Sequence, residues 1–148
     1  MKKQQGSGLL EVMIGLFVLA IGLLGMSSMQ SKALRSNNTA YMYSQAIFLA
    51  NDITERIRAN RSEVSAYSSS YTDSHSATAA CESNNCTAAQ IAEWDLAGWK
   101  ADVAALLPQG KAEITISGTT NDIVKVVVEF DDSRGQNPAI DISMSTQI

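Results

Sequence analysis

The residue types that could do chemistry are few in this chain. It contains two cysteines, Cys81 and Cys86, with four residues between them, and one histidine, His75. Two thiols and one imidazole do not make up a recognisable zinc pattern. A cysteine pair at short spacing in a polar stretch most simply forms a disulfide if that part of the chain lies outside the cytoplasm. The residues therefore favour a Cys81–Cys86 disulfide over a metal site.

The sequence also argues against catalysis. His75 stands alone, and an oxidised cysteine pair supplies no nucleophile, so no Ser/His/Asp, Cys/His or paired-carboxylate arrangement can be assembled. The net charge is −4, and the only basic cluster, at 56–61, is interpreted as the solvated face and end of a helix. We therefore expect no enzyme, no cofactor and no nucleic-acid partner.

One carboxylate lies in unusual surroundings, since Glu11 falls inside the apolar run 6–26. From Leu9 to Met26 this run has eighteen residues, about 27 Å as a helix, close to the thickness of a bilayer core. A charge at membrane depth costs about 2.5–3.5 kcal/mol on insertion scales and is usually kept for a partner or a pathway. Glu11 either reaches headgroup water near the interface or has such a partner.

The flanks of the run bear on its role. Lys2 and Lys3 precede it, which favours a cytoplasmic N-terminus. A cleaved signal peptide is disfavoured, because the run is long, carries Glu11 and is followed by no clean small-residue cleavage site. We expect a membrane-spanning helix and, beyond it, one small domain.

The elements around these residues follow from periodicity. No glycine or proline occurs between Met26 and Leu96, which predicts that the apolar helix continues to about Asn60. Asp52 with Arg56, and Glu55 with Arg58, are expected to be surface pairs. A stripe of apolar side chains is predicted to face the core: Ala46, Leu49, Ala50, Ile53 and Ile57.

The segment 62–86 is rich in Ser, Thr, Ala and Asn and has no apolar periodicity, so it is predicted to be a long loop stapled by the cysteines. Tyr67 and Tyr71 are expected to pack on the domain, with a contact surface as the alternative. Such a loop could also act as a binding module for a ligand, for a host surface or for DNA.

Thr87 is a candidate N-cap for a second helix over 88–107, which Pro108 and Gly110 close. Trp94 and Trp99 are expected to be core or interface anchors. One side of this helix is predicted to be apolar: Leu96, Trp99, Val103, Leu106 and Leu107.

The last third predicts three strands, at 111–117, 123–130 and 139–146, separated by turn-forming stretches. Alternation places Ile114 and Ile116 on one face, and Ile140, Ile142 and Met144 on one face. The strands form an antiparallel meander packed on the long helix. The expected class is α+β.

The N-terminus resembles that of class III type IV prepilins, in which a basic leader ends in Gly and the mature chain carries Glu at its fifth position. The resemblance places the cut after Gly6, makes Ser7 the new N-terminus and puts Glu11 at position five, although that family usually begins with Phe. It implies cleavage by a prepilin peptidase. It also implies that Glu11 pairs with an N-terminal amine of its own chain or of a neighbour.

Three further motifs are similar to those of the PilV minor pilins, the type IV pilus modification proteins. They are 43–61, the pair Cys81 and Cys86, and 88–110. The resemblance implies the type IV pilin fold and a role in priming or capping a pilus that supports adhesion or twitching motility. The implied partners are other minor pilins, the major pilin, the inner-membrane assembly platform and the membrane itself.

The implied organisation has a leader at 1–6, a transmembrane and filament-core helix at 7–30, and a periplasmic head at 31–148 that is carried into the extracellular filament. Gly15, Gly22 and Gly25 would permit close approach of neighbouring helices. Two alternatives remain open at this point. One is a pseudopilin of a type II secretion system, and the other is a signal-anchored periplasmic binding protein.

Overall fold

The computed structural model describes residues 7–77, 79–83, 85–118, 123–133 and 135–148. The chain divides into two compact units, Met1–Ala40 and Tyr41–Ile148. Gly6, the predicted end of the leader, lies outside the described residues.

Helix α1 (Ser7–Ala59) runs without interruption, as the absence of glycine and proline after Met26 predicts. Its residues in the first unit are exposed from Gly8 to Asn38. This helix is the one among the described residues that is long and apolar enough to cross a membrane, with a mean hydropathy of 2.4 and none of that apolar window buried.

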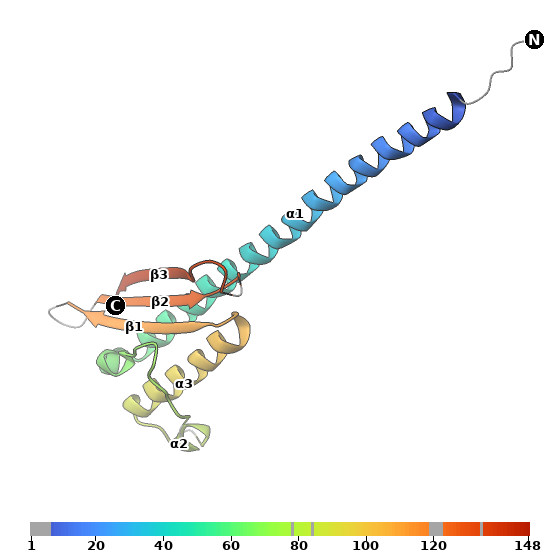
Figure 1. Cartoon of the computed structure of the whole chain (residues 1–148). Helices are drawn as coiled ribbons and strands as arrows, with labels where there is room; N and C mark the ends of the chain where they lie inside the picture. The colour runs from blue at the N-terminus through green and yellow to red at the C-terminus, as the bar shows by residue number, and fades with distance from the viewer. Residues whose placement is uncertain (1–6, 78, 84, 119–122, 134) are drawn as a thin grey trace, which may run out of the picture. The chain divides into compact units, whose positions relative to one another are not determined.

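The second unit contains the sheet (Figure 1). Strands β1 (Lys111–Ser117), β2 (Ile123–Phe130) and β3 (Ile140–Gln147) lie in the order β1-β2-β3, and both pairs are antiparallel. The first two strands have the predicted bounds, and the third is shifted by one residue. The meander is therefore confirmed.

One face of the sheet packs on two helices, α3 (Ala88–Leu106) and the last part of α1. The predicted stripe on α1 is buried, with exposures from 0% to 3%. Trp99 is fully buried, and its Nε1 donates a hydrogen bond to the carbonyl oxygen of Leu49, 2.9 Å away. Trp99 is thus a core anchor, as predicted.

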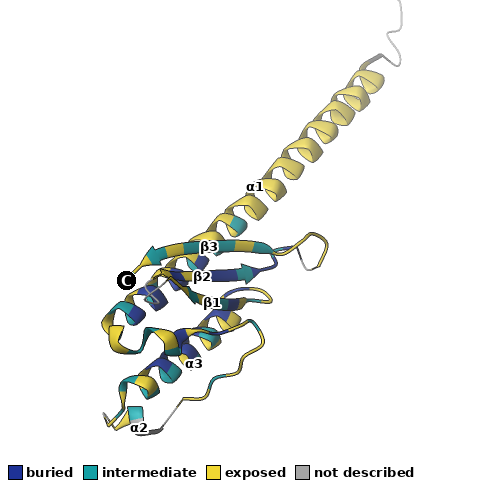
Figure 2. Ribbon diagram, turned by 90° about the vertical axis from the view of Figure 1, so that its left-hand side faces the viewer, coloured by how far each residue is buried: buried dark blue, intermediate teal, exposed yellow. Residues whose placement is uncertain are grey.

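Burial falls off across the sheet. Figure 2 shows β2 mostly buried, while β3 alternates between intermediate and exposed residues. Ile114 is buried and Ile116 is half-buried, so both face the core. Ile140, Ile142 and Met144 also pack against the core, but only in part.

Helix α3 begins and ends as its sequence predicts, with one exception. Thr87 and Gln90 form a capping box: the Thr87 hydroxyl accepts the Gln90 backbone N–H, and the Gln90 side chain accepts the Thr87 N–H. A Cβ at Gly110 would overlap the carbonyl oxygen of Val103, so this close turn requires glycine. Leu106, on the side predicted to be apolar, is 53% exposed, because the helix ends there and Leu107 turns into the core instead.

The prediction of an unstructured loop over 62–86 is wrong in three places. A 3₁₀ helix, η1 (Arg61–Tyr67), follows α1 directly. Ser69 then pairs with Ile114 of β1 in an antiparallel bridge, and a short helix, α2 (Ala79–Glu82), precedes the second cysteine. Long-range backbone pairing supplies the order that local periodicity does not reveal.

Candidate functional site

The two cysteines form the expected disulfide. Cys81 and Cys86 have Cα atoms 4.9 Å apart and are bonded to each other. The bridge joins α2 to the turn before α3, and the Sγ atom of Cys81 lies 3.6 Å from the carbonyl oxygen of Gln90. It therefore fixes the end of the 62–86 segment against α3.

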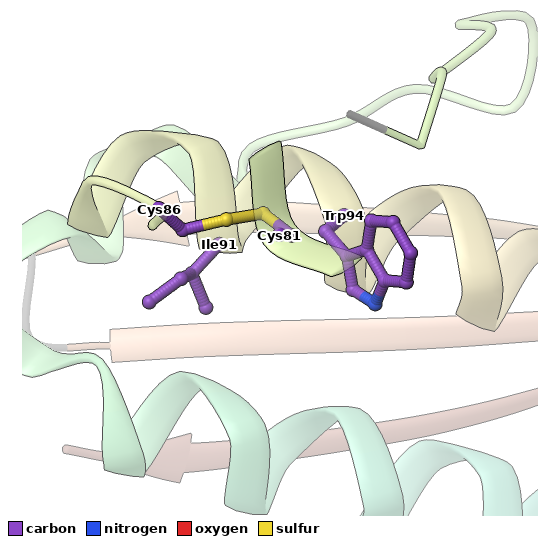
Figure 3. A pocket seen from close by; sticks show the side chains of 4 residues that line it. All are labelled: Cys81, Cys86, Ile91 and Trp94. Atoms are coloured by element: carbon purple, nitrogen blue, oxygen red, sulfur yellow. A yellow bond between two sulfur atoms is a disulfide. The ribbon is translucent and has the colours of Figure 1, made fainter. Parts of the chain in front are cut away.

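A pocket of about 310 Å³ opens beside this disulfide. Cys81, Cys86, Ile91 and Trp94 line it, and Figure 3 shows the Ile91 side chain below the bridge and the Trp94 ring beyond its Cys81 end. No titratable side chain is among these lining residues. The pocket offers an apolar surface with an indole ring, and the described residues that line it supply no group for acid, base or nucleophilic chemistry.

The sequence suggested that His75 stands alone, but in the structure its ring contacts two side chains. Its Nδ1 lies 2.9 Å from Oε2 of Glu93, and its Nε2 lies 2.8 Å from Oγ of Ser69. Because a carboxylate only accepts hydrogen bonds, Nδ1 carries the proton, and in the neutral ring Nε2 accepts the Ser69 hydroxyl. The hydrogen bond from His75 lowers the pKa of Glu93 below its ordinary range.

This order of groups is that of a Ser–His–acid triad, but its setting differs from that of a nucleophile. Ser69 is only 4% exposed. Its backbone N–H donates to the carbonyl oxygen of Ile114, and its own carbonyl oxygen accepts the Ile114 N–H. None of the three residues lines the pocket beside the disulfide. We therefore interpret the arrangement as a clamp that holds the segment around His75 against β1 and α3.

Lys100 holds the same segment at a second point. Its Nζ donates to the carbonyl oxygens of Ser70 and Asp73, at 2.6 Å and 2.9 Å. Burial lowers the pKa of Lys100, while Asp73 opposes that shift. The Asp73 carboxylate in turn accepts the backbone N–H of Ser70, which lowers the Asp73 pKa. The loop is thus closed on itself and tied to α3.

A buried carboxylate, Asp95 on α3, connects three elements. It accepts hydrogen bonds from Tyr67 Oη at 2.7 Å and from Arg56 Nη1 at 3.2 Å. Asn60 donates to Tyr67 Oη and to the carbonyl oxygen of Ala88. The Asp52–Arg56 pair predicted at the surface exists, but Arg56 also reaches inward to Asp95. Neither Asp95 nor its partners carried a sequence signal of this network.

The network explains why Tyr67 is buried with a protonated phenol. Tyr67 is fully buried, which confirms the packing prediction for this residue, while Tyr71 is half-buried. Burial raises the pKa of Tyr67 well above its ordinary value, and Asp95 adds to that shift. The phenol therefore stays neutral and acts as a donor between η1 and α3.

Glu11 lies in different surroundings, on the part of α1 within the first unit. It is exposed, and helix register places it one turn after Ser7, the first residue of the helix, on the same face. It is the only charged residue between Leu9 and Gln30. A free amine at Ser7 would therefore lie within reach of this carboxylate.

The apolar side chains around Glu11 have no cover within the described chain. From Leu9 to Met29, the large hydrophobic residues are between 56% and 74% exposed. A continuous apolar surface of this length requires lipid or other apolar helices.

Comparison with known families gives two matches, which together cover residues 1–97. Residues 1–27 match the family described as the prokaryotic N-terminal methylation motif, and residues 28–97 match Tt1218-like, type IV pilin Tt1218. The chain carries a type IV pilin domain behind a prepilin leader motif. No curated protein and no solved structure shows a significant match to the chain.

The architecture agrees with the type IV pilin fold, with its long N-terminal helix, three-stranded antiparallel sheet, extra helix and disulfide. The pilin match ends within α3, so β1, β2 and β3 lie beyond it. A pilin domain is structural rather than catalytic, which agrees with the buried position of Ser69.

The methylation motif and the pilin domain together support a pilin role, in a pilus or a pseudopilus. They imply processing by a prepilin peptidase and assembly with other pilins. With the apolar part of α1, they indicate membrane anchoring followed by incorporation into a filament.

Proposed function

We propose that this chain is a minor pilin of the PilV type, which helps to prime or cap a type IV pilus that supports adhesion or twitching motility. The observation that carries the proposal is Glu11, the only charged residue between Leu9 and Gln30, in the exposed apolar stretch of α1 that comes before the pilin match at 28–97. A helix that served only as a membrane anchor would not need a charged residue that is costly to place at membrane depth.

The proposed processing supplies a positively charged partner for Glu11. A prepilin peptidase cuts after Gly6 on the cytoplasmic side, and the leader 1–6 is released. Ser7 then bears a free amine, which pairs with Glu11 of its own helix or of a neighbouring subunit. Pairing lowers the cost of burying both charges when the helices leave the bilayer and pack together.

The remaining parts of the chain have distinct roles in this proposal. Residues 7–30 serve first as the transmembrane segment and then as part of the filament core. Residues 31–148 form the periplasmic head, whose Asp95 network and His75 clamp keep it folded during the transfer. The partners are other minor pilins, the major pilin and the inner-membrane assembly platform.

The test substitutes Glu11→Ala and compares filament incorporation with leader removal in cells. We expect the leader to be removed as in the native chain, and the amount of this chain in sheared surface filaments to fall at least about tenfold. The matched control is Asp102→Ala, which removes an exposed carboxylate from α3.

Normal incorporation of the Glu11→Ala chain would contradict the proposed role of the carboxylate. Recovery of the native chain with a secretion apparatus, and not with surface pili, would favour the pseudopilin alternative instead.

A further inference from the structure

Strand β3 lies at an edge of the sheet. It pairs with β2 on one side only, and the described residues include no strand on its other side. In an antiparallel strand, alternate residues direct their N–H and C=O groups away from the existing partner. The outer side of β3 therefore presents a row of backbone donors and acceptors. Arg58 Nη2 donates to the Thr146 hydroxyl, which leaves 140–145 as the accessible part.

This edge lacks most of the features that usually prevent strand pairing, and Asp141 is its one charged side chain. Edge strands are commonly protected by shortness, by proline, by lysine or by a bulge. β3 has eight residues, Ile-Asp-Ile-Ser-Met-Ser-Thr-Gln, and contains neither proline nor a basic residue. Its register with β2 is continuous from Ile140 to Gln147, so no bulge interrupts it. The other edge of the sheet differs, because Ser69 pairs with Ile114 there.

The apolar layer beneath the sheet is incomplete at β3. On β2 the inward side chains of Val124, Val126 and Val128 are fully buried. The inward side chains of Ile140 and Ile142 on β3 are only partly buried. An added strand with apolar residues on its inner face would remove this remaining surface from water.

The charges on the outer face of the sheet favour a basic residue on an added strand. Lys111, Glu129 and Asp141 lie opposite one another on the three strands, and Lys111 Nζ is 3.8 Å from Glu129 Oε1. Glu129 thus has a basic neighbour on β1 and an acidic neighbour on β3. Like charges directly opposite, such as Glu129 and Asp141, are unfavourable, and a cation on an added strand would give Asp141 a neighbour of opposite charge. The pKa of nearby Tyr71 is raised first by burial and then by Glu113, Asp141 and Glu129, in agreement with an acidic face.

We propose that β3 accepts a fourth strand from a different protein, an extended segment that alternates apolar and polar residues and places Lys or Arg opposite Asp141. A second copy of this chain fits less well, because β3 itself offers no basic residue for that position. The proposal concerns the head alone and does not depend on cleavage at Gly6 or on Glu11.

The test uses the full chain in zwitterionic detergent micelles and two synthetic peptides of the length of β3. Both peptides alternate Val and Thr, and one carries Lys where the other carries Glu. Nuclear magnetic resonance follows amide exchange over 140–145 during titration to about 1 mM peptide. We expect slowed exchange at alternate β3 amides and at least about threefold tighter binding of the Lys peptide, because a favourable pair replaces a like-charge pair.

Two variants sharpen the test. Asp141→Lys is expected to reverse the preference in favour of the Glu peptide. The matched control, Asp102→Lys on α3, makes the same change of charge away from the sheet and is expected to keep the native preference. Binding of both peptides with equal affinity to the native chain, or unchanged β3 amides at the highest concentration, would overturn the proposal. Protection of β3 that depends on the concentration of the chain alone would identify a second copy as the occupant and would also overturn it.

Discussion

Tyr67 and Asp95 form a buried hydrogen bond, with 2.7 Å between the phenol oxygen and Oδ2, although 28 positions separate them in the sequence. Tyr67 belongs to η1 and Asp95 to α3, so the bond joins the segment after α1 to the second helix of the head. Arg56 adds the charge that a buried carboxylate needs. The network is therefore a structural element of the head.

Replacing Tyr67 by Phe is expected to destabilise the head. The change leaves one Asp95 oxygen without its donor and removes an acceptor from Asn60, while the ring itself is retained. Loss of a hydrogen bond to a charged group costs about 1.5–3 kcal/mol. Urea unfolding of the full chain in micelles, followed by the fluorescence of Trp94 and Trp99, measures the change.

Tyr71→Phe is the control for that experiment, because Tyr71 is half-buried and its hydroxyl has no hydrogen bond among the described contacts. It is expected to change the free energy of unfolding by less than about 0.5 kcal/mol. Equal effects of the two substitutions would show that the Tyr67–Asp95 bond contributes nothing specific.

The clamp around His75 is expected to open in acid. The pKa of Glu93 is lowered in the folded chain, chiefly by the hydrogen bond from His75. The folded chain therefore binds a proton at the Glu93 carboxylate less readily than the unfolded chain does. The contribution of the ionised Glu93 to stability is complete above the ordinary carboxyl pKa, near 4.5, and is lost as the pH falls through the lowered value.

Hydrogen exchange at the Ser76 amide reports this opening, because that N–H donates to Glu93. We expect its protection to decrease below about pH 4.5 in the native chain and to be low at all pH values in Glu93→Gln. Asp102→Asn should behave as the native chain does. A pH-independent protection of Ser76 in the native chain would rule out the clamp as described.

Removing the disulfide is expected to have a limited effect. Cys81 and Cys86 close a short loop, with a sequence separation of 5, and the chain-entropy relation gives about 2 kcal/mol for a loop of this size. Replacing both cysteines by Ser should lower the free energy of unfolding by no more than about that amount, since the core under Trp99 is untouched. Loss of the cooperative unfolding transition in the double variant would show that the bridge holds the whole head together.

Regular periodicity explains why much of the fold could be predicted. The alternation in 111–117 and the β-branched residues in 123–130 predicted both strands to the residue, and Thr87 as an N-cap predicted the start of α3. The apolar spacing did not show that Leu106 is exposed, because it continues to the turn at which the helix ends.

The contacts that could not be predicted are long-range and polar. Asp95 meets Arg56 across 39 positions, and His75 meets Glu93 across 18. A polar residue that will be buried has the same local signature as one that stays in water, so only the tertiary arrangement of α1, η1 and α3 distinguishes them. The structure therefore changed the interpretation of His75 and of the 56–61 cluster.

The intact mass of this chain, recovered from sheared surface filaments, shows whether it is a processed pilin. We expect the chain to be present in the filaments and to begin at Ser7, either unmodified or with one methyl group on its N-terminus. A chain that retains residues 1–6, or one that is found only in the membrane fraction while other pilins fill the filaments, would contradict this expectation.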